Sequence, residues 1–223
     1  FLLLPLFLTG CGEGFLNLRP NEQLPTDEAI KTIDDLNSAI IGIYSGLQCA
    51  DHYGRYFILV PDVMSDDVKQ NASANRAKEY AEYQGFPEHF IAQNVWARLY
   101  STINRANTVI NADIELPAAV QEEKNQLVGV AYAIRAMVHF DLVRLYGQHY
   151  GFTADNSHEG VPIVTEFDQD AEPTRNTVGE VYTQVVADLE QAISLMNDDF
   201  ATNRMSKVAA QALLARVYLY MGE

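Results

Sequence analysis

The chain has 223 residues, 48% of them hydrophobic and 20% charged, which is typical of a globular protein rather than a disordered one. Its formal net charge is −15 at pH 7. This charge disfavours a nucleic-acid partner, because the phosphate backbone must be met by Lys and Arg. It disfavours adsorption onto anionic lipid for the same reason.

The first eight residues, FLLLPLFL, are continuously apolar and are followed by Thr9, Gly10 and Cys11. The run is too short to span a bilayer but fits the apolar core of a signal peptide. Residues 8–11 (LTGC) resemble the bacterial lipobox, in which cleavage before Cys leaves that residue to carry lipid. A plain secretory signal with a chance Cys is the alternative. We therefore expect a partial lipoprotein signal peptide at 1–10, a lipid on Cys11 and no transmembrane helix in the mature protein.

Residues 11–25 are rich in Gly, Pro and polar residues and are expected to form a tether between the lipid and the domain. The domain then covers residues 26–223. If Cys11 is acylated, Cys49 has no disulfide partner, and we expect it to be a buried, inert thiol.

The first expected helix starts after Thr26, a candidate N-cap, with Asp27 and Glu28 in its first turn. It ends near Gln48. Its apolar stripe consists of Leu36, Ala39, Ile40, Ile43, Tyr44 and Leu47.

Residues 50–93 lack a sustained period. The one apolar run, at 56–60, is expected to stop at Pro61. A long irregular segment inside a compact domain usually has a binding role or is disordered. The aromatic content of this segment argues against disorder, and a binding role is therefore expected.

Residues 127–147 are expected to form the central helix. They are apolar nearly all round, which places a helix either among other helices or inside a membrane. Arg135, His139, Asp141 and Arg144 interrupt the pattern too often for a membrane span. A buried helix of a helical array is therefore predicted, with His139 as a packed core residue.

The remaining helices are marked by spacing and caps. Apolar residues at Trp96, Leu99, Ile103, Ala106 and Ile110 predict one helix before the central one. A loop is expected from 147 to 175. A capping box at 177–180 and a Ser at 206 then predict two further helices, and a partner helix should follow the last of them, so that a C-terminal part is expected to be missing.

Several motifs occur in the order found in the SusD/RagB family. They resemble that family's W-x3-Y-x2-I-x-R-A-N helix, its "LRA…yfdLvrlyG" helix, the loop and helix start that follow, and two later helices. The matching segments are 96–107 (WARLYSTINRAN), 135–147, 160–162 (GVP), 175–182, 188–192 and 209–219. The similarity runs from about Cys11 to the end of the chain.

This resemblance implies an all-α fold of tetratricopeptide-like helix pairs with long irregular loops. It implies a surface-exposed, lipid-anchored outer-membrane protein of Bacteroidetes that forms a lid over a SusC-like TonB-dependent transporter. Such proteins capture a glycan, or sometimes a peptide, and hand it to the transporter. They are not enzymes, and since they are longer than this chain, it is expected to cover their N-terminal half.

No catalytic or metal-binding pattern accompanies these motifs. The five histidines lie far apart, without metal-type spacing, and no nucleophile elbow, P-loop or dinucleotide fingerprint is present. Adjacent carboxylates such as Asp198 and Asp199 could support glycoside hydrolysis only if a cleft held two of them together, and a solvated acidic surface is the simpler interpretation. We expect no cofactor and no metal.

Sugar recognition requires flat aromatic faces and planar polar groups. The segment from 66 to 90 supplies both, and its candidate ligand-binding residues are Asp66, Asp67, Arg76, Tyr80, Tyr83 and Phe86. The alternative is that Tyr80 and Tyr83 cover the helical core. Trp96 is in register with core positions, so that core packing is favoured over sugar stacking.

The arginines at 105, 135 and 144 are interpreted as buried or half-buried partners of helix ends and carboxylates. The favoured function is glycan capture for a transporter. The alternatives are a helical-repeat scaffold for surface proteins, a peptide-binding member of the same family, and a surface glycan hydrolase. The hydrolase would need two carboxylates in one pocket, and the scaffold would need an exposed apolar helix face.

Overall fold

The computed structural model describes residues 30–65, 67–71, 73, 76–168, 170–198 and 203–223. Within these ranges the chain forms seven α-helices and one short 3-10 helix, with an isolated antiparallel bridge between Glu159 and Thr177 as the only β-type pairing. The predicted all-α fold class is confirmed. The signal peptide at 1–10, the tether at 11–25 and the lipid on Cys11 lie outside the described residues and stay predictions.

Helix α1 (Ile33–Leu47) begins six residues later than expected. Thr32 is its cap: the Thr32 side chain accepts from the Asp35 amide, and the Asp35 carboxylate accepts from the Thr32 amide. Residues 30 to 32 are not helical, so the helix does not run on from Thr26, which itself lies outside the described residues. The full capping box at 32–35 satisfies two amides, whereas the sequence pattern at 26 offered a cap alone.

Helix α2 (Tyr56–Met64) contains Pro61, so the expectation that Pro61 stops the apolar run is wrong. The amides of Phe57 and Leu59 are hydrogen-bonded to carbonyls of the preceding turn, which holds the start of the helix. The Ser65 amide bonds to the Pro61 carbonyl and closes its end. Proline therefore removes one hydrogen bond from a short helix whose two ends are independently fixed.

A second short helix, α3 (Lys78–Ala81), also lies in the segment expected to be irregular. Helix α4 (Phe90–Ile110) follows, as the spacing of its apolar residues predicts. Its cap is His89, whose Nδ1 accepts from the Ile91 amide at 3.2 Å. The 3-10 helix η2 (Ala118–Val120) leads directly into α5 (Gln121–Tyr146).

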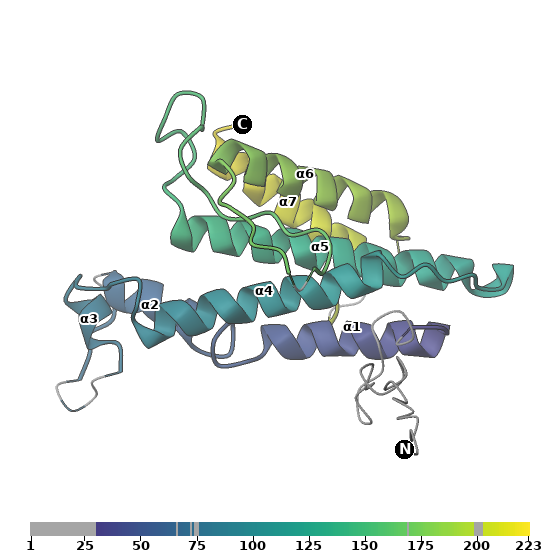
Figure 1. The fold of residues 1–223 in the computed structure, drawn as a ribbon, viewed down its shortest axis with the longest axis horizontal. Helices are drawn as coiled ribbons and strands as arrows, with labels where there is room; N and C mark the ends of the chain where they lie inside the picture. The colour runs from purple at the N-terminus through teal and green to yellow at the C-terminus, as the bar shows by residue number, and fades with distance from the viewer. Residues whose placement is uncertain (1–29, 66, 72, 74–75, 169, 199–202) are drawn as a thin grey trace, which may run out of the picture.

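Helix α5 is the centre of the molecule, as predicted. It contacts α1, α4, α6 and α7, and in Figure 1 it lies between the α1–α4 side and the α6–α7 side. Ala118–Tyr146 is long and apolar enough to cross a membrane, but 78% of its apolar 18-residue stretch is buried inside the protein. The apolar surface of this helix is therefore covered by the other helices.

Helices α6 (Val178–Leu195) and α7 (Lys207–Met221) form the last pair. The predicted capping box of Thr177 and Glu180 and the predicted cap Ser206 are both confirmed. Gly222 adopts a left-handed conformation, with φ of 82°, and ends α7. Helices α2 and α3 lie at the end of the molecule where α4 begins and α5 finishes (Figure 1).

Candidate ligand-binding cavity

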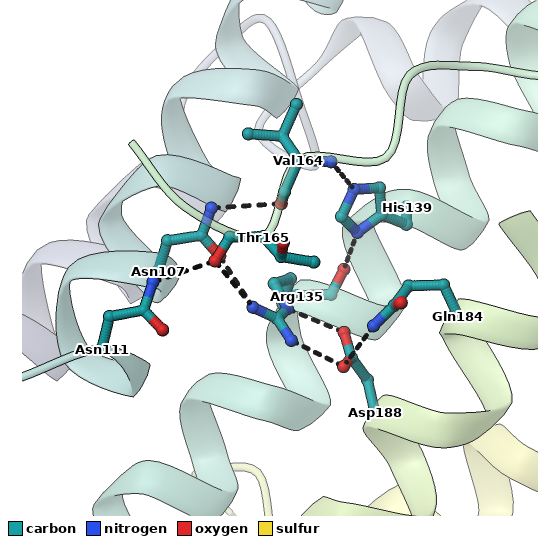
Figure 2. Close-up of polar contacts among 8 residues, drawn as sticks. All are labelled: Asn107, Asn111, Arg135, His139, Val164, Thr165, Gln184 and Asp188. Carbon is teal, nitrogen blue, oxygen red and sulfur yellow. Dashed lines mark hydrogen bonds and ion pairs between the residues drawn. The ribbon is translucent and has the colours of Figure 1, made fainter. Parts of the chain in front are cut away.

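A buried polar network joins the three central helices (Figure 2). Arg135 on α5 donates from Nε and Nη2 to the two oxygens of Asp188 on α6, at 2.8 and 2.7 Å. Its Nη1 donates to Asn107 Oδ1 on α4, at 2.9 Å. The side chains of Arg135 and Asp188 are only 5% and 3% exposed. This arginine is therefore a buried structural partner, as predicted.

The same network holds the loop between α5 and α6 against the helices. Asn107 Nδ2 donates to the Val164 carbonyl at 3.1 Å, and Asn111 Nδ2 donates to the Thr165 carbonyl at 2.9 Å. The Val164 amide donates to His139 Nε2 at 3.4 Å. Side chains from α4 and α5 therefore fix the backbone of this loop against the core.

His139 is fully buried and packed, as predicted. Its Nδ1 donates to the Arg135 carbonyl, at 3.2 Å, because its Nε2 accepts from Val164. Burial, together with the positive charge of Arg135, lowers the pKa of His139 to about 3. The side chain is therefore neutral, since a second ring proton would have no acceptor.

The other two arginines have different surroundings. Arg144 is half-buried and pairs with Asp141 on the same helix, as predicted. Arg105 is exposed, so the expectation of burial is wrong for it, although it does donate to a helix carbonyl, that of Gly42 on α1, at 2.6 Å. Cys49 is half-buried rather than buried and forms no disulfide within the described part of the chain.

A cavity of about 740 Å³ lies where α4 begins and α5 ends. It is open on one side and mostly apolar. Its aromatic lining comes from α2, the segment around α3, α4 and the end of α5, and consists of Tyr56, Phe57, Tyr80, Tyr83, Phe86, Trp96 and Tyr146. This volume falls in the range of small-molecule sites.

The cavity wall formed by α4 and α5 is held by ring contacts and hydrogen bonds. Trp96 stacks edge-on against Tyr146, with ring centroids 4.9 Å apart, and also packs on Tyr100, at 5.0 Å. The hydroxyls of Tyr100 and Tyr146 donate to the carbonyls of Pro162 and Ala92, at 2.8 and 2.7 Å. Burial raises the pKa of both phenols, which stay neutral donors. Trp96 is half-buried, so it both packs on the core and presents surface to the cavity.

The opposite wall holds three of the predicted ligand-binding residues. Tyr80, Tyr83 and Phe86 all line the cavity. Tyr83 is 67% exposed, and its hydroxyl donates to the Met64 carbonyl at 2.5 Å. Its φ of 55° is in the left-handed region, which is strained for a bulky residue. Gly85 sits close to Tyr80, because a Cβ at 85 would lie 3.1 Å from that ring.

His89 packs against two of the aromatic side chains of this wall. Its ring packs against those of Tyr80 and Phe86, with centroids 5.0 and 5.5 Å away. Since Nδ1 accepts from the α4 backbone, Nε2 carries the proton and faces Glu79 Oε2 at 3.4 Å. The cap of α4 therefore also positions the aromatic side chains.

The two predicted polar residues that the structure describes, Asp67 and Arg76, do not join the site. Arg76 is exposed and donates to the hydroxyl of Tyr56, at 3.2 Å, without lining the cavity. Asp67 is exposed and does not line it either. Asp66 lies outside the described residues.

Sequence reasoning missed the lining residues that come from other segments. Tyr56 and Phe57 belong to the apolar run at 56–60, whose residues are not among the predicted ligand-binding residues. Tyr146 is the last residue of α5, in the segment 135–147 that resembles the SusD/RagB family. No local signal singles out Arg175, which reaches the cavity from the loop before α6.

The chemistry of the lining suits binding rather than catalysis. No carboxylate lies among the described residues that line the cavity, so the pair needed for glycoside hydrolysis is not assembled there. Within the described ranges, no group of three or more His, Cys, Asp and Glu residues could hold a metal ion. Aromatic ring faces beside a few polar groups are the surface on which sugar rings stack.

Comparison with known proteins gives a consistent family. Residues 14–219 match the model of a SusD-like family described as "Starch-binding associating with outer membrane". SusD-like protein P2 of Formosa agariphila is 29% identical over 232 residues, covering 100% of this chain and 43% of that protein.

Solved structures share the fold. A protein from Bacteroides vulgatus ATCC 8482 has a TM-score of 0.79 and 35% identity, covering 87% of this chain and 44% of its own. A SusD superfamily protein from Bacteroides thetaiotaomicron VPI-5482 has a TM-score of 0.76 and 29% identity, covering 86% of this chain and 43% of its own. The chain therefore spans about two fifths of the length of the relatives that it matches.

Proposed function

We propose, from the premise that this chain belongs to the SusD-like family, that it captures a glycan at the cell surface and passes it to a SusC-like TonB-dependent outer-membrane transporter. SusD-like proteins are binding proteins rather than enzymes, and the family description associates them with the outer membrane. The observation that carries the proposal is the aromatic cavity between α2, α3 and α4.

The proposed mechanism is reversible capture. Tyr83, Phe86 and Trp96 offer exposed or partly exposed ring surface on two sides of the cavity. Sugar rings stack their C–H faces on such surfaces while their hydroxyls find hydrogen-bond partners at the rim. Stacking contacts of this kind release the ligand readily, which suits delivery to a second protein.

The direct test is affinity electrophoresis of the complete gene product, without its signal and lipid anchor, in native gels that contain single polysaccharides. Tyr80→Ala and Tyr83→Ala should abolish the retardation caused by the bound polysaccharide. Phe152→Ala is the matched control, because Phe152 is 56% exposed but does not line the cavity. Retardation that survives both tyrosine substitutions would contradict the site.

Calorimetry with oligosaccharides and peptides distinguishes the two ligand classes of the family. Peptide binding without glycan binding would replace the proposed ligand. No binding to either class, together with firm co-purification with a transporter, would favour the scaffold alternative.

The anchor is tested separately. We propose that Cys11 carries acyl chains, which confine the protein to the membrane plane and raise its effective concentration near the transporter. Cys11→Ser should abolish the incorporation of labelled palmitate and release the protein from the membrane fraction. Continued incorporation in that variant would contradict the lipobox assignment.

A further inference from the structure

Arg175 is the one charged side chain among the described residues that line the cavity. The rest of the described lining carries no charged group, and its polar side chains are Gln93 and the tyrosines. A guanidinium in otherwise uncharged surroundings sets the electrostatic character of the cavity, because nothing else in the lining compensates it.

The hydrogen bonds of Arg175 orient its side chain without neutralising it. Nη1 donates to the carbonyls of Tyr146 and Gly160, at 3.0 and 2.7 Å. The guanidinium carbon lies 5.6 Å from the centroid of the Trp96 ring. Within the described part of the chain, Nε and Nη2 have no hydrogen-bond partner, and no carboxylate forms an ion pair with Arg175.

The contrast between Arg175 and the two arginines of α5 is one of charge balance. Arg135 forms a bidentate ion pair with Asp188, and Arg144 forms an ion pair with Asp141. Each of those guanidinium groups has its counter-ion inside the protein. Arg175 is exposed, held in place by carbonyls, and left with its charge toward the cavity.

The ligand chemistry that fits this arrangement is a sugar that carries an oxyanion. The planar guanidinium pairs with a carboxylate or sulfate through parallel N–H donors. Beside it, Trp96 offers ring surface for the apolar face of a sugar. One acidic sugar can engage both groups, because the cation and the ring are adjacent.

Resting on the glycan-binding function proposed above, we propose that the cavity selects an acidic glycan, with Arg175 binding the carboxylate or sulfate of a sugar unit that stacks on Trp96. The chain as a whole has a net charge of −15 and repels anions. At physiological salt this repulsion is screened over about 8 Å. A preference for an acidic glycan must therefore come from the local contact at Arg175.

The test compares acidic polysaccharides with their neutral twins. The complete gene product is run in native gels that contain polygalacturonate or its full methyl ester, a sulfated polysaccharide or its desulfated form, and a panel of neutral glycans, followed by calorimetry on the ligands that retard it. The expected result is retardation by an acidic polymer, and a loss of affinity of roughly ten- to hundredfold for the neutral twin. Loss of binding on methyl esterification identifies a carboxylate as the bound group, and loss of binding on desulfation identifies a sulfate.

Variants assign the effect to Arg175. Arg175→Gln should lose the same factor for the acidic ligand, and Arg175→Lys should keep a preference for the acidic twin. Arg204→Gln removes a charge from an exposed residue that does not line the cavity and should change nothing. Thermal unfolding of each variant checks that the loop before α6 is intact.

The failure of this inference differs from failure of the glycan-binding function. Retardation by neutral glycans alone, or by acidic ones equally in Arg175→Gln, would overturn the acidic preference and leave glycan capture standing. Equal losses in the Gln and Lys variants for every ligand would assign Arg175 a structural role and overturn it too. Binding of peptides only, or of no ligand, would overturn both.

Discussion

The buried network around Arg135 and the cavity around Arg175 each contain an arginine held by hydrogen bonds, and they differ in whether the fold supplies a counter-ion for it. At Arg135, helices on both sides supply Asp188 and Asn107, and the guanidinium has its counter-ion within the fold. At Arg175, the helices end, and carbonyls are the only described protein acceptors. A charge or a ring becomes a binding group where no neighbouring helix covers it, whatever its residue type.

The largest effect is expected for a substitution in the buried network around Arg135. Asp188→Ala leaves Arg135 buried without its counter-ion, and should lower the free energy of unfolding in urea by about 3–5 kcal/mol. Glu190→Ala, on the same helix but exposed, should change it by less than about 0.5 kcal/mol. Arg175→Gln should cost about 1 kcal/mol or less, because that side chain is exposed. A small effect at Asp188 would mean that the network does not stabilise the core.

A pH titration tests the same region through His139. Its folded pKa, about 3, lies below the ordinary value of 6.5, so the unfolded chain takes up a proton that the folded protein refuses. The stabilisation is complete above about pH 6.5 and is lost progressively as the pH falls toward 3, by at most about 1.4 kcal/mol per pH unit. Urea unfolding at pH 7.5, 6 and 5 measures this slope.

His139→Gln should flatten that slope, because the variant has no proton to take up. The control is His149→Gln, which changes an exposed loop histidine and should keep the slope. An unchanged slope in His139→Gln would assign the acid sensitivity to other groups.

Alanine substitutions at two helical glycines, Gly129 and Gly42, compare a closely packed position with one that has open space around it. A Cβ on Gly129 of α5 would lie 2.7 Å from Met196 Cγ and 3.2 Å from the Ala192 carbonyl of α6. Gly129→Ala should therefore destabilise the protein, by about 1–3 kcal/mol. Gly42→Ala in α1 meets nothing within 4 Å and should stabilise it, by about 0.5–1 kcal/mol, through helix propensity. Thermal and urea unfolding give both signs, and equal signs would contradict the packing argument.

An effect on stability smaller than that of Asp188→Ala is expected in the cavity wall. Because Tyr83 has φ of 55°, Tyr83→Gly should be more stable than Tyr83→Ala, by about 1 kcal/mol. Both variants should lose glycan affinity to the same extent, because both lack the ring. Equal stability of the two would show that position 83 is not strained, and retained affinity would remove Tyr83 from the site.

Much of the fold could be predicted from the sequence because its signals are local. The caps at Thr177 and Ser206 and the apolar spacing of α4, α5 and α6 depend on residues within a few positions of one another. The predictions failed where local rules were overruled. Pro61 sits inside a helix that is held at both ends, and the first cap is Thr32 because a full capping box there satisfies more backbone amides.

The cavity was decided by the tertiary structure. The sequence singled out Tyr80, Tyr83 and Phe86 by their clustering in one segment, and the structure places all three in its lining. It could not bring Tyr56, Trp96 or Arg175 to them, because those residues are separated by whole helices. Which faces are covered and which stay open depends on how the start of α4 and the end of α5 pack against α2 and the loop before α6. These segments meet at one end of the molecule (Figure 1). Covalent neighbours determine a helix, whereas a cavity exists only between elements that packing has brought together.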